Sequence, residues 1–430
     1  MTTIEIVAFD SCNSLTSVEI PNSVTAIGGA AFRGCSSLAS ASISNSVTNI
    51  KYEAFYGCSS LTSVVIPNSV THIEWQTFCN CSSLTSVKIP DNVTSIETSA
   101  FYGCINMTSV NIPNSMMSIG GSAFDKCNDN LYTNVGGVKY IDNWVVGVEN
   151  EQIVSANIKI GTRGIADASF IFCNNLKNVT IPNSMISIGD GAFSSCHSLT
   201  SVEIPNSVEN IGVGAFLGCY NLEQIILSEE NKAYCSVDNC IIEKSSKTLV
   251  AGCKTSIIPS DGSVTSIGER AFYGCRSLTS VTIPNSVTSI GSEAFSGCSS
   301  LTSVEIPNSV TSIGERAFYG CSSLTSIEIP NSVVDIGDKA FYECESLISV
   351  TIPNSVTYIG EEAFSYCGLT DIEIPMSVKG IGEKAFVRCE SLTNVTFGGT
   401  KEQWKSLQGA LWLFDAKVRV VKCADGDVAV

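Results

Sequence analysis

The stretch LTSVEIPNSVTSIGERAFYGCSS, residues 301–323, contains the pattern that decides the fold. The pattern recurs every 23 residues along most of the chain, and its phenylalanine marks fifteen clear copies. These are Phe9, Phe32, Phe55, Phe78, Phe101, Phe124, Phe170, Phe193, Phe216, Phe272, Phe295, Phe318, Phe341, Phe364 and Phe386. One unit of this length cannot bury its own apolar side, whereas stacked units bury theirs against their neighbours. The sequence therefore predicts a solenoid of about seventeen coils, degenerate copies included, rather than a series of globular domains.

The order of elements can be predicted within one coil. Residues 304–306 alternate apolar and polar side chains, which predicts a strand with one buried face. Pro307 lacks a backbone donor and ends this strand, and Asn308 is typical of the turn that follows. Residues 315–319 have room for one helical turn only, which we expect to be a 3₁₀ turn.

Two interruptions and a C-terminal segment depart from the repeat. We expect the solenoid to cover residues 1–397, with hairpins at about 131–152 and about 228–257. Residues 398–430 are expected to form a C-terminal cap made of a helix and a strand. Trp404, Leu407 and Leu411 have helical spacing there, and residues 417–421 are the expected strand.

The first residues lack any comparable cap. Ile4 holds the repeat position of Ile27, so the chain starts in mid-coil. We therefore expect an upstream segment in the natural protein, such as a signal peptide with further coils.

Composition excludes several classes of partner. The 430 residues include 24 basic and 41 acidic side chains, which gives a net charge of −17 at pH 7. Such a chain repels phosphate backbones, so we expect no nucleic-acid partner. No run of 18 apolar residues could span a membrane, and residues 1–10 have neither the basic start nor the apolar core of a secretory signal.

Fifteen of the twenty cysteines occupy one repeat position. They are Cys12, Cys35, Cys58, Cys81, Cys104, Cys127, Cys173, Cys196, Cys219, Cys275, Cys298, Cys321, Cys344, Cys367 and Cys389. Parallel neighbours do not aim their Cβ atoms at one another as a disulfide requires, so we expect a column of buried free thiols. Cys235, Cys240 and Cys253 share the second interruption, where a disulfide remains an open alternative and no strong zinc spacing occurs.

No catalytic, cofactor-binding or metal-binding set is expected. His72 and His197 lie far apart at variable positions, and no third group recurs beside either one to orient a nucleophile. The glycines follow the repeat rather than any phosphate-binding pattern. We expect no cofactor.

The predicted sheet supplies the candidate binding surface. The exposed middle residues of its strands include six candidate partner contacts, namely Glu203, Thr282, Glu305, Glu328, Thr351 and Glu373. Such an acidic, hydroxyl-rich face suits a basic or extended protein partner, although it could equally be a solvated face that only keeps the sheet soluble.

The inserted hairpins offer a second candidate surface. Loops inserted into a repetitive scaffold often carry specificity, which makes Tyr140 and Trp144 in the first hairpin candidate insertion contacts. The alternative is that the hairpins are spacers that adjust curvature.

The unit quoted above resembles the BspA-type leucine-rich repeat, and the resemblance extends from residue 4 to about residue 397. It implies an α/β solenoid of the leucine-rich repeat type. Such a horseshoe or superhelix has a parallel β-sheet on the concave face and short helical or 3₁₀ turns opposite. The family is known from surface proteins of gut and oral bacteria, spirochaetes and some protozoan parasites. That implies adhesion to host proteins or neighbouring cells.

Two hypotheses about function follow. The first is a non-enzymatic, adhesin-like scaffold, at the cell surface or secreted, that binds a host matrix protein or a cell-surface protein. The alternative is an intracellular interaction scaffold or effector, which the free thiols and the missing signal favour. An enzyme would need a pocket with a convergent set of titratable groups, and the sequence offers none.

Overall fold

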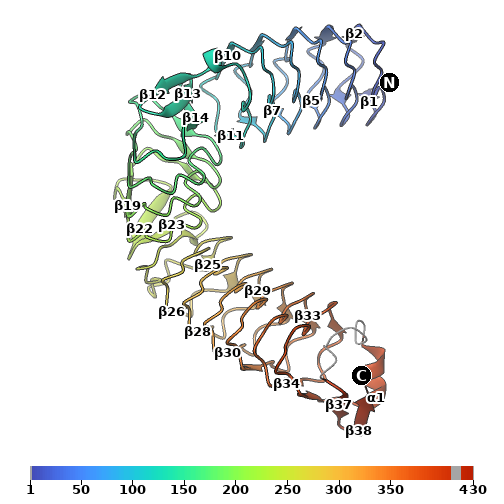
Figure 1. The fold of residues 1–430 in the computed structure, drawn as a ribbon, viewed down its shortest axis with the longest axis vertical. Helices are drawn as coiled ribbons and strands as arrows, with labels where there is room; N and C mark the ends of the chain where they lie inside the picture. The colour runs from blue at the N-terminus through green and yellow to red at the C-terminus, as the bar shows by residue number, and fades with distance from the viewer. Residues whose placement is uncertain (1, 408–417, 430) are drawn as a thin grey trace. The chain divides into compact units, whose positions relative to one another are not determined.

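The computed structural model describes residues 2–407 and 418–429. The chain forms two compact units: unit 1 consists of Met1–Phe193 with Ser207–Ala215, and unit 2 of Ser194–Asn206 with Phe216–Val430. Each unit is a stack of coils in which equivalent residues of successive coils lie side by side (Figure 1).

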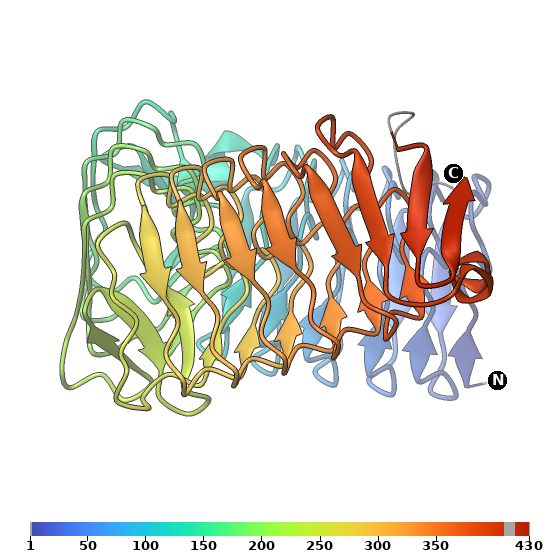
Figure 2. The same ribbon diagram turned by 90° about the horizontal axis from the view of Figure 1, so that it is seen from below.

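A regular coil contributes two short strands, and most of them pair in parallel with the equivalent strand of a neighbouring coil, forming a first and a second ladder. First-ladder strands of unit 1 are β2 (Ser17–Ile20), β4 (Ser40–Ile43), β6 (Ser63–Val64), β8 (Ser86–Lys88), β10 (Ser109–Asn111), β15 (Ser155–Asn157) and β17 (Asn178–Thr180). Those of unit 2 are β19 (Ser201–Ile204), β21 (Gln224–Leu227), β26 (Ser280–Thr282), β28 (Ser303–Glu305), β30 (Ser326–Glu328), β32 (Ser349–Thr351), β34 (Asp371–Ile374) and β36 (Asn394–Phe397), and the later ones lie side by side in Figure 2.

The second ladder is made of two-residue strands that end in isoleucine. In unit 1 they are β1 (Thr3–Ile4), β3 (Ala26–Ile27), β5 (Asn49–Ile50), β7 (His72–Ile73), β9 (Ser95–Ile96), β11 (Ser118–Ile119), β16 (Gly164–Ile165), β18 (Ser187–Ile188) and β20 (Asn210–Ile211). In unit 2 they are β25 (Ser266–Ile267), β27 (Ser289–Ile290), β29 (Ser312–Ile313), β31 (Asp335–Ile336), β33 (Tyr358–Ile359) and β35 (Gly380–Ile381). Pairing always joins equivalent residues, as Ile313 with Ile336, because the register equals the repeat length.

The turn after the second ladder differs from the expected helical or 3₁₀ turn. Arg316 and Gly320 have left-handed backbones, with φ of 52° and 67°. A right-handed helix cannot accommodate a left-handed residue at every fourth position. Amides therefore alternate between two kinds of acceptor. Ala317 N donates to Gly314 O within the coil at 3.2 Å, whereas Phe318 N donates to Ala340 O of the next coil at 2.8 Å. The result is a stack of turns; in the described part of the chain the helical elements are η1 (Asp129–Leu131) and α1 (Lys401–Ser406).

The core of each unit is built from columns of identical side chains. Repeat phenylalanines stack with ring centroids 5.2 Å apart for Phe9 and Phe32 in unit 1 and 5.1 Å apart for Phe272 and Phe295 in unit 2. Their planes are nearly parallel, at 4° and 6°, so equivalent rings repeat one orientation in successive coils.

Both interruptions are three-stranded antiparallel meanders. The first contains β12 (Thr133–Val135), β13 (Val138–Ile141) and β14 (Trp144–Val148). The second contains β22 (Tyr234–Val237), β23 (Cys240–Glu243) and β24 (Thr248–Ala251). In each, the last strand pairs in parallel with the second ladder, β14 with β16 and β24 with β25. The insertions are thus joined to the ladder by main-chain hydrogen bonds.

Beyond the last coil, α1 (Lys401–Ser406) has Thr400 as its N-cap, whose hydroxyl accepts a hydrogen bond from Gln403 N in a capping box. Trp404 and Leu407 are buried, as their helical spacing predicts, and Leu411 lies outside the described residues. The strand predicted over residues 417–421 is β37 (Val420–Cys423), which pairs with β36 and then with β38 (Gly426–Ala429). No helix within residues 2–407 and 418–429 is long and apolar enough to cross a bilayer.

Candidate binding surfaces

The first ladder of unit 2 presents the row of residues that the sequence singles out. In β28 the side chains of Ser303 and Glu305 are exposed and Val304 between them is buried, because successive side chains of a strand point to opposite faces. The six candidate contacts are all exposed: Glu203, Thr282, Glu305, Glu328, Thr351 and Glu373.

The strand register decides which of these side chains are neighbours. Thr282 is paired with Glu305, and Glu328 with Thr351. Adjacent strands lie about 4.8 Å apart, so each of these carboxylates has a hydroxyl on one side, while Glu305 and Glu328 hold the same repeat position in successive coils and lie next to each other. Within the described residues, no ion pair engages any glutamate of this row. The row can therefore accept hydrogen bonds and ion pairs from a partner.

The two candidate insertion contacts lie in the core instead of on the surface. Tyr140 is 0% exposed and Trp144 is 1% exposed. Their burial follows from β14 joining the second ladder, which turns Trp144 onto Gly164, where a Cβ would come within 2.3 Å of the indole ring. The Tyr140 hydroxyl accepts a hydrogen bond from Lys159 N at 3.1 Å. Neither side chain can contact a partner from this position, so the expectation for these two residues needs correction.

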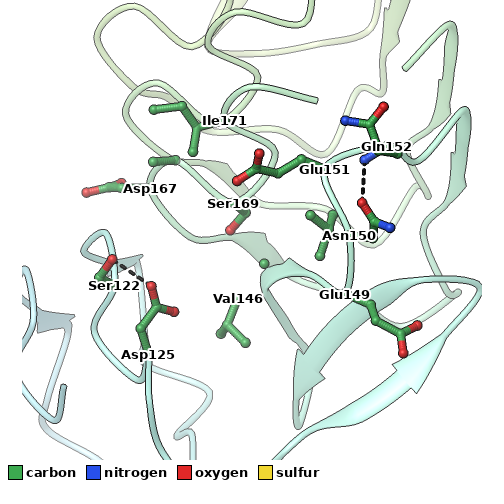
Figure 3. A pocket seen from close by; sticks show the side chains of 13 residues that line it. Ser122, Asp125, Val146, Glu149, Asn150, Glu151, Gln152, Asp167, Ser169 and Ile171 are labelled. Carbon is green, nitrogen blue, oxygen red and sulfur yellow. Dashed lines mark hydrogen bonds between the residues drawn. The ribbon is translucent and has the colours of Figure 1, made fainter. Parts of the chain in front are cut away.

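An acidic pocket of about 440 Å³ lies beside the same meander in unit 1 (Figure 3). It is formed where the chain leaves β14 and passes the turn of the next coil. Its polar lining includes Ser122, Asp125, Glu149, Glu151, Asp167 and Ser169. The carboxylates come from three separate stretches of the sequence, and no local motif marks them. Sequence reasoning therefore missed this pocket.

Asp167 is a half-buried carboxyl group of the pocket. Its Oδ1 accepts a hydrogen bond from Asp190 N at 2.8 Å, which fixes it between two coils. Burial raises the pKa of Asp167 to about 6. An ammonium or guanidinium group placed in the pocket would favour the ionised form of this carboxyl.

The cysteines form no disulfide in the described residues. All twenty cysteines are free, including Cys235, Cys240 and Cys253, so no disulfide forms in the second interruption. Burial raises the pKa of Cys240 to about 12, which keeps that thiol protonated at neutral pH. Among the described residues, no group of three or more His, Cys, Asp or Glu side chains could hold a metal ion.

A family model described as a BspA type leucine-rich repeat region with six copies matches residues 2–130, 148–246 and 246–367. These segments make up well over half of the chain. The chain belongs to the BspA-type leucine-rich repeat family. No curated protein matches this BspA-type chain.

Several solved structures are similar to this BspA-type repeat chain. A leucine-rich cell surface protein from Faecalibacterium prausnitzii A2-165 is 29% identical, with 95% of this chain and 86% of that chain covered and a TM-score of 0.47. A leucine-rich repeat protein from Bacteroides ovatus ATCC 8483 is 27% identical over 98% of this chain and 87% of that chain, with a TM-score of 0.37. The pneumococcal vaccine antigen PcpA is 20% identical over 81% of this chain and 85% of that chain, with a TM-score of 0.51, a likeness of fold.

Proposed function

We propose that the chain is a non-enzymatic protein-binding scaffold, adhesin-like and at the cell surface or secreted, which engages proteins of a host or of neighbouring cells. The observation that carries the proposal is the row of exposed, unpaired carboxylates and hydroxyls on the first ladder of unit 2. Membership of the BspA-type leucine-rich repeat family supports it, because that family is known from surface proteins.

The row fits a basic, extended partner. Its carboxylates and hydroxyls lie on neighbouring strands of the first ladder, and the net charge of −17 adds a long-range attraction for cations. An extended segment with lysine or arginine side chains would form ion pairs with Glu305 and Glu328 and hydrogen bonds with the serine row, such as Ser303 and Ser326. The acidic pocket of unit 1 offers a separate place for a basic side chain.

The alternative function is an intracellular interaction scaffold. The twenty free cysteines favour it, because unpaired thiols persist in a reducing compartment. Fractionation of the source cells separates the two: recovery at the surface or in the medium supports the adhesin-like role, and recovery only in the cytosol supports the alternative.

The test of binding uses the purified full chain. It would be immobilised and screened against host matrix proteins and intact cells, with saturation measured at several salt concentrations. We expect saturable binding that weakens as salt rises, because screening reduces the attraction of the acidic row. The absence of saturable binding to any matrix protein or cell surface would contradict the proposal.

A further inference from the structure

An exposed tryptophan lies on the turn that follows the second ladder in unit 1. Trp75 comes two residues after β7 and is 43% exposed, whereas Trp144 and Trp404 are buried. Its equivalent in the preceding coil is Tyr52, and the two rings stack with centroids 5.0 Å apart and planes 3° apart. The rest of the indole faces solvent.

Tyr52 covers one face of the indole and leaves the other open. The Tyr52 ring itself packs over Gly29 of the coil before it, where a Cβ would come within 2.5 Å of the ring, so both rings lean toward preceding coils. The open face of Trp75 is therefore directed at the following coil, where the short side chain of Thr98 holds the equivalent position. Among the described residues, no other ring and no cation packs on Trp75.

A carboxylate borders this open face. Glu97 precedes Thr98 in the following coil, and two main-chain hydrogen bonds fix both residues beside Trp75. Glu97 N donates to Ile73 O at 2.8 Å, and Gln76 N donates to Thr98 O at 3.1 Å. An exposed aromatic face and an exposed carboxylate thus lie next to each other on adjoining coils.

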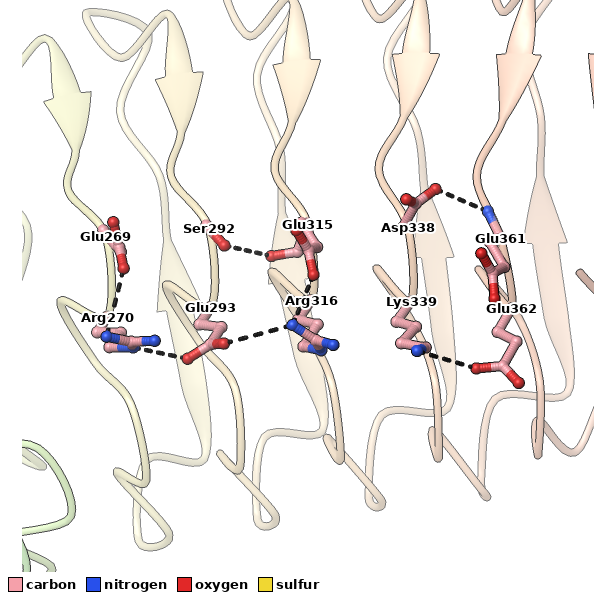
Figure 4. A network of polar contacts seen from close by, with 10 residues as sticks. All are labelled: Glu269, Arg270, Ser292, Glu293, Glu315, Arg316, Asp338, Lys339, Glu361 and Glu362. Carbon is pink, nitrogen blue, oxygen red and sulfur yellow. Dashed lines mark hydrogen bonds and ion pairs between the residues drawn. The ribbon is translucent and has the colours of Figure 1, made fainter. Parts of the chain in front are cut away.

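The Glu97 carboxylate lacks the cation that its neighbour has. In the preceding coil, Glu74 Oε1 lies 2.8 Å from Lys51 Nζ. In unit 2, ion pairs join the turns of successive coils in the same way (Figure 4). Glu97 Oε1 accepts a hydrogen bond from Ser95 Oγ at 3.3 Å, and within residues 2–407 and 418–429 no ion pair engages it. Its charge is available to a cation from outside the chain.

The chain itself shows which group can cover an aromatic face between coils. In unit 2 the Tyr220 ring stacks on His197 of the preceding coil with centroids 4.4 Å apart. The guanidinium of Arg276, in the coil that follows in the stack, lies 4.3 Å from the centroid of the same Tyr220 ring. Trp75 has the stacked ring from one neighbouring coil but no cation from the other.

A guanidinium group suits both halves of this surface. It is planar and weakly hydrated, so it can lie flat on an indole, and tryptophan is the best aromatic side chain for such a contact. Its N–H groups lie in its plane and donate to a carboxylate at its edge. An ammonium group is a compact, strongly hydrated charge and cannot stack in this way.

We propose that Trp75 and Glu97 bind an arginine side chain of a protein partner. The guanidinium would lie on the open indole face above Thr98, as Arg276 lies on Tyr220, and would donate to the Glu97 carboxylate. The proposal rests on the protein-binding function above for the source of the arginine. It adds to that function a specific contact in unit 1, separate from the acidic row of unit 2.

The first experiment titrates the full chain with N-acetyl-argininamide. We expect saturable binding in the millimolar range by calorimetry. In NMR spectra of the chain with labelled tryptophan, the indole N–H signal of Trp75, assigned through the Trp75→Phe variant, should shift during the titration. N-acetyl-citrullinamide has the same shape without the charge, and it should bind more weakly by roughly fivefold or more.

The variants separate the two contacts from effects on folding. Trp75→Ala and Glu97→Gln should each lower the affinity by about fivefold or more. Glu345→Gln removes an exposed carboxylate elsewhere and is the matched control, which should bind as the wild type does. Thr98→Arg supplies a guanidinium from the chain itself, so it should keep or raise the melting temperature and abolish binding of the arginine amide.

Four outcomes would overturn the proposal. They are no saturable binding of N-acetyl-argininamide, equal binding of the citrulline amide, unchanged affinity in Glu97→Gln and Thr98→Arg, and saturation by methyl glycosides in place of the arginine amide. Failure here can be told apart from failure of the proposed function. If protein partners bind the wild type and the Thr98→Arg variant alike, the scaffold role stands and only the arginine site is wrong.

Discussion

Many cysteines of the repeat donate a hydrogen bond to the phenylalanine carbonyl of the preceding coil, which explains the residue type. In unit 2, the carbonyl oxygen of Phe295 accepts two hydrogen bonds. One comes from Cys298 N of its own coil at 3.2 Å, and one from the Sγ of Cys321 in the next coil at 3.3 Å. A thiol is small and apolar enough for the core and still donates weakly, which neither alanine nor valine does.

Cys321→Ala should therefore lower the free energy of unfolding by about 1–2 kcal/mol. The variant loses the S–H donor and leaves a small void among buried side chains. Urea unfolding followed by circular dichroism measures the change. Cys12→Ala is the matched control, because Cys12 holds the same repeat position and is exposed. An equal effect of both variants would contradict this explanation.

The buried thiols should also resist modification. Burial raises the pKa of Cys58 and of Cys298 to about 12, so both remain protonated and shielded at pH 8. With a thiol reagent on the folded chain, we expect fast labelling of Cys12 and slower labelling of the half-buried Cys127, Cys235 and Cys423. The buried thiols should react only after unfolding, as mass spectrometry of labelled peptides would show. Rapid labelling of Cys298 in the folded chain would refute this.

At the scale of one element, the turn after the second ladder depends on a glycine for close approach. A Cβ on Gly314 would lie 2.7 Å from the carbonyl carbon of Gly291 in the preceding coil. Backbone atoms cannot move aside as a flexible side chain can, so successive coils would be forced apart. The glycine thus serves the close spacing of the glycine-bearing coils of unit 2 rather than a left-handed backbone, since Lys51 and Glu97 hold the same repeat position in unit 1.

Gly314→Ala should lower the free energy of unfolding by about 2 kcal/mol or more, measured by thermal and urea denaturation. Gly320→Asn is the control. Gly320 has a left-handed backbone, but Asn80 holds the same repeat position with φ of 58°, so asparagine is tolerated there. We expect less than about 1 kcal/mol of destabilisation for this control. A larger loss of stability in Gly320→Asn than in Gly314→Ala would show that the close approach of the coils at Gly314 does not limit stability.

A turn element in unit 1 makes a pH-dependent contribution. Burial raises the pKa of Asp167 from 3.8 to about 6, so the folded chain binds this proton more tightly than the unfolded chain does. The stabilisation is fully present below pH 3.8 and is lost as the pH rises through about 6. After allowance for solvent screening, it amounts to about 1–2 kcal/mol.

Asp167→Asn should remove that part of the pH dependence, because asparagine does not ionise and its Oδ1 can still accept the bond from Asp190 N. Urea unfolding at pH 4 and at pH 7 would be compared between the variant and the wild type. We expect the loss of stability from pH 4 to pH 7 to be smaller in the variant. Identical pH dependence in both proteins would contradict the assignment.

At the scale of the whole molecule, the acidic row should govern encounter with a basic partner more than the stability of the fold. Glu305, Glu328 and Glu373 are exposed, so changing all three to glutamine should leave the melting temperature unchanged. The association rate with a basic protein partner should fall about tenfold at low salt, as surface plasmon resonance would show, and the difference should vanish in high salt.

The control for this variant changes the same number of charges elsewhere in unit 2. Glu345, Glu361 and Glu390 are exposed and lie outside the first ladder. Their replacement by glutamine should reduce the rate less than replacement of the ladder glutamates. Equal losses would mean that net charge alone, rather than the row, steers the partner.

Much of the fold could be predicted because it repeats. The alternation in residues such as Val304 and Glu305 specifies one buried and one exposed face, and fifteen copies make the stacking of equivalent residues unavoidable. The six contacts of the acidic row are exposed for the same local reason. The prediction of a helical turn at residues 315–319 was wrong. Arg316 has a left-handed backbone there, which hydrogen bonds to the next coil impose and which the residue type does not reveal.

The sequence by itself determined the coil, its register and the columns of phenylalanine and cysteine, since a strict period forces each residue onto its equivalent. Only the tertiary structure decided what happens where the period breaks. The pairing of β14 with β16 buries Tyr140 and Trp144, and three separate stretches bring the carboxylates together around Asp167. These features depend on contacts between coils, and a pattern within one coil contains no record of them.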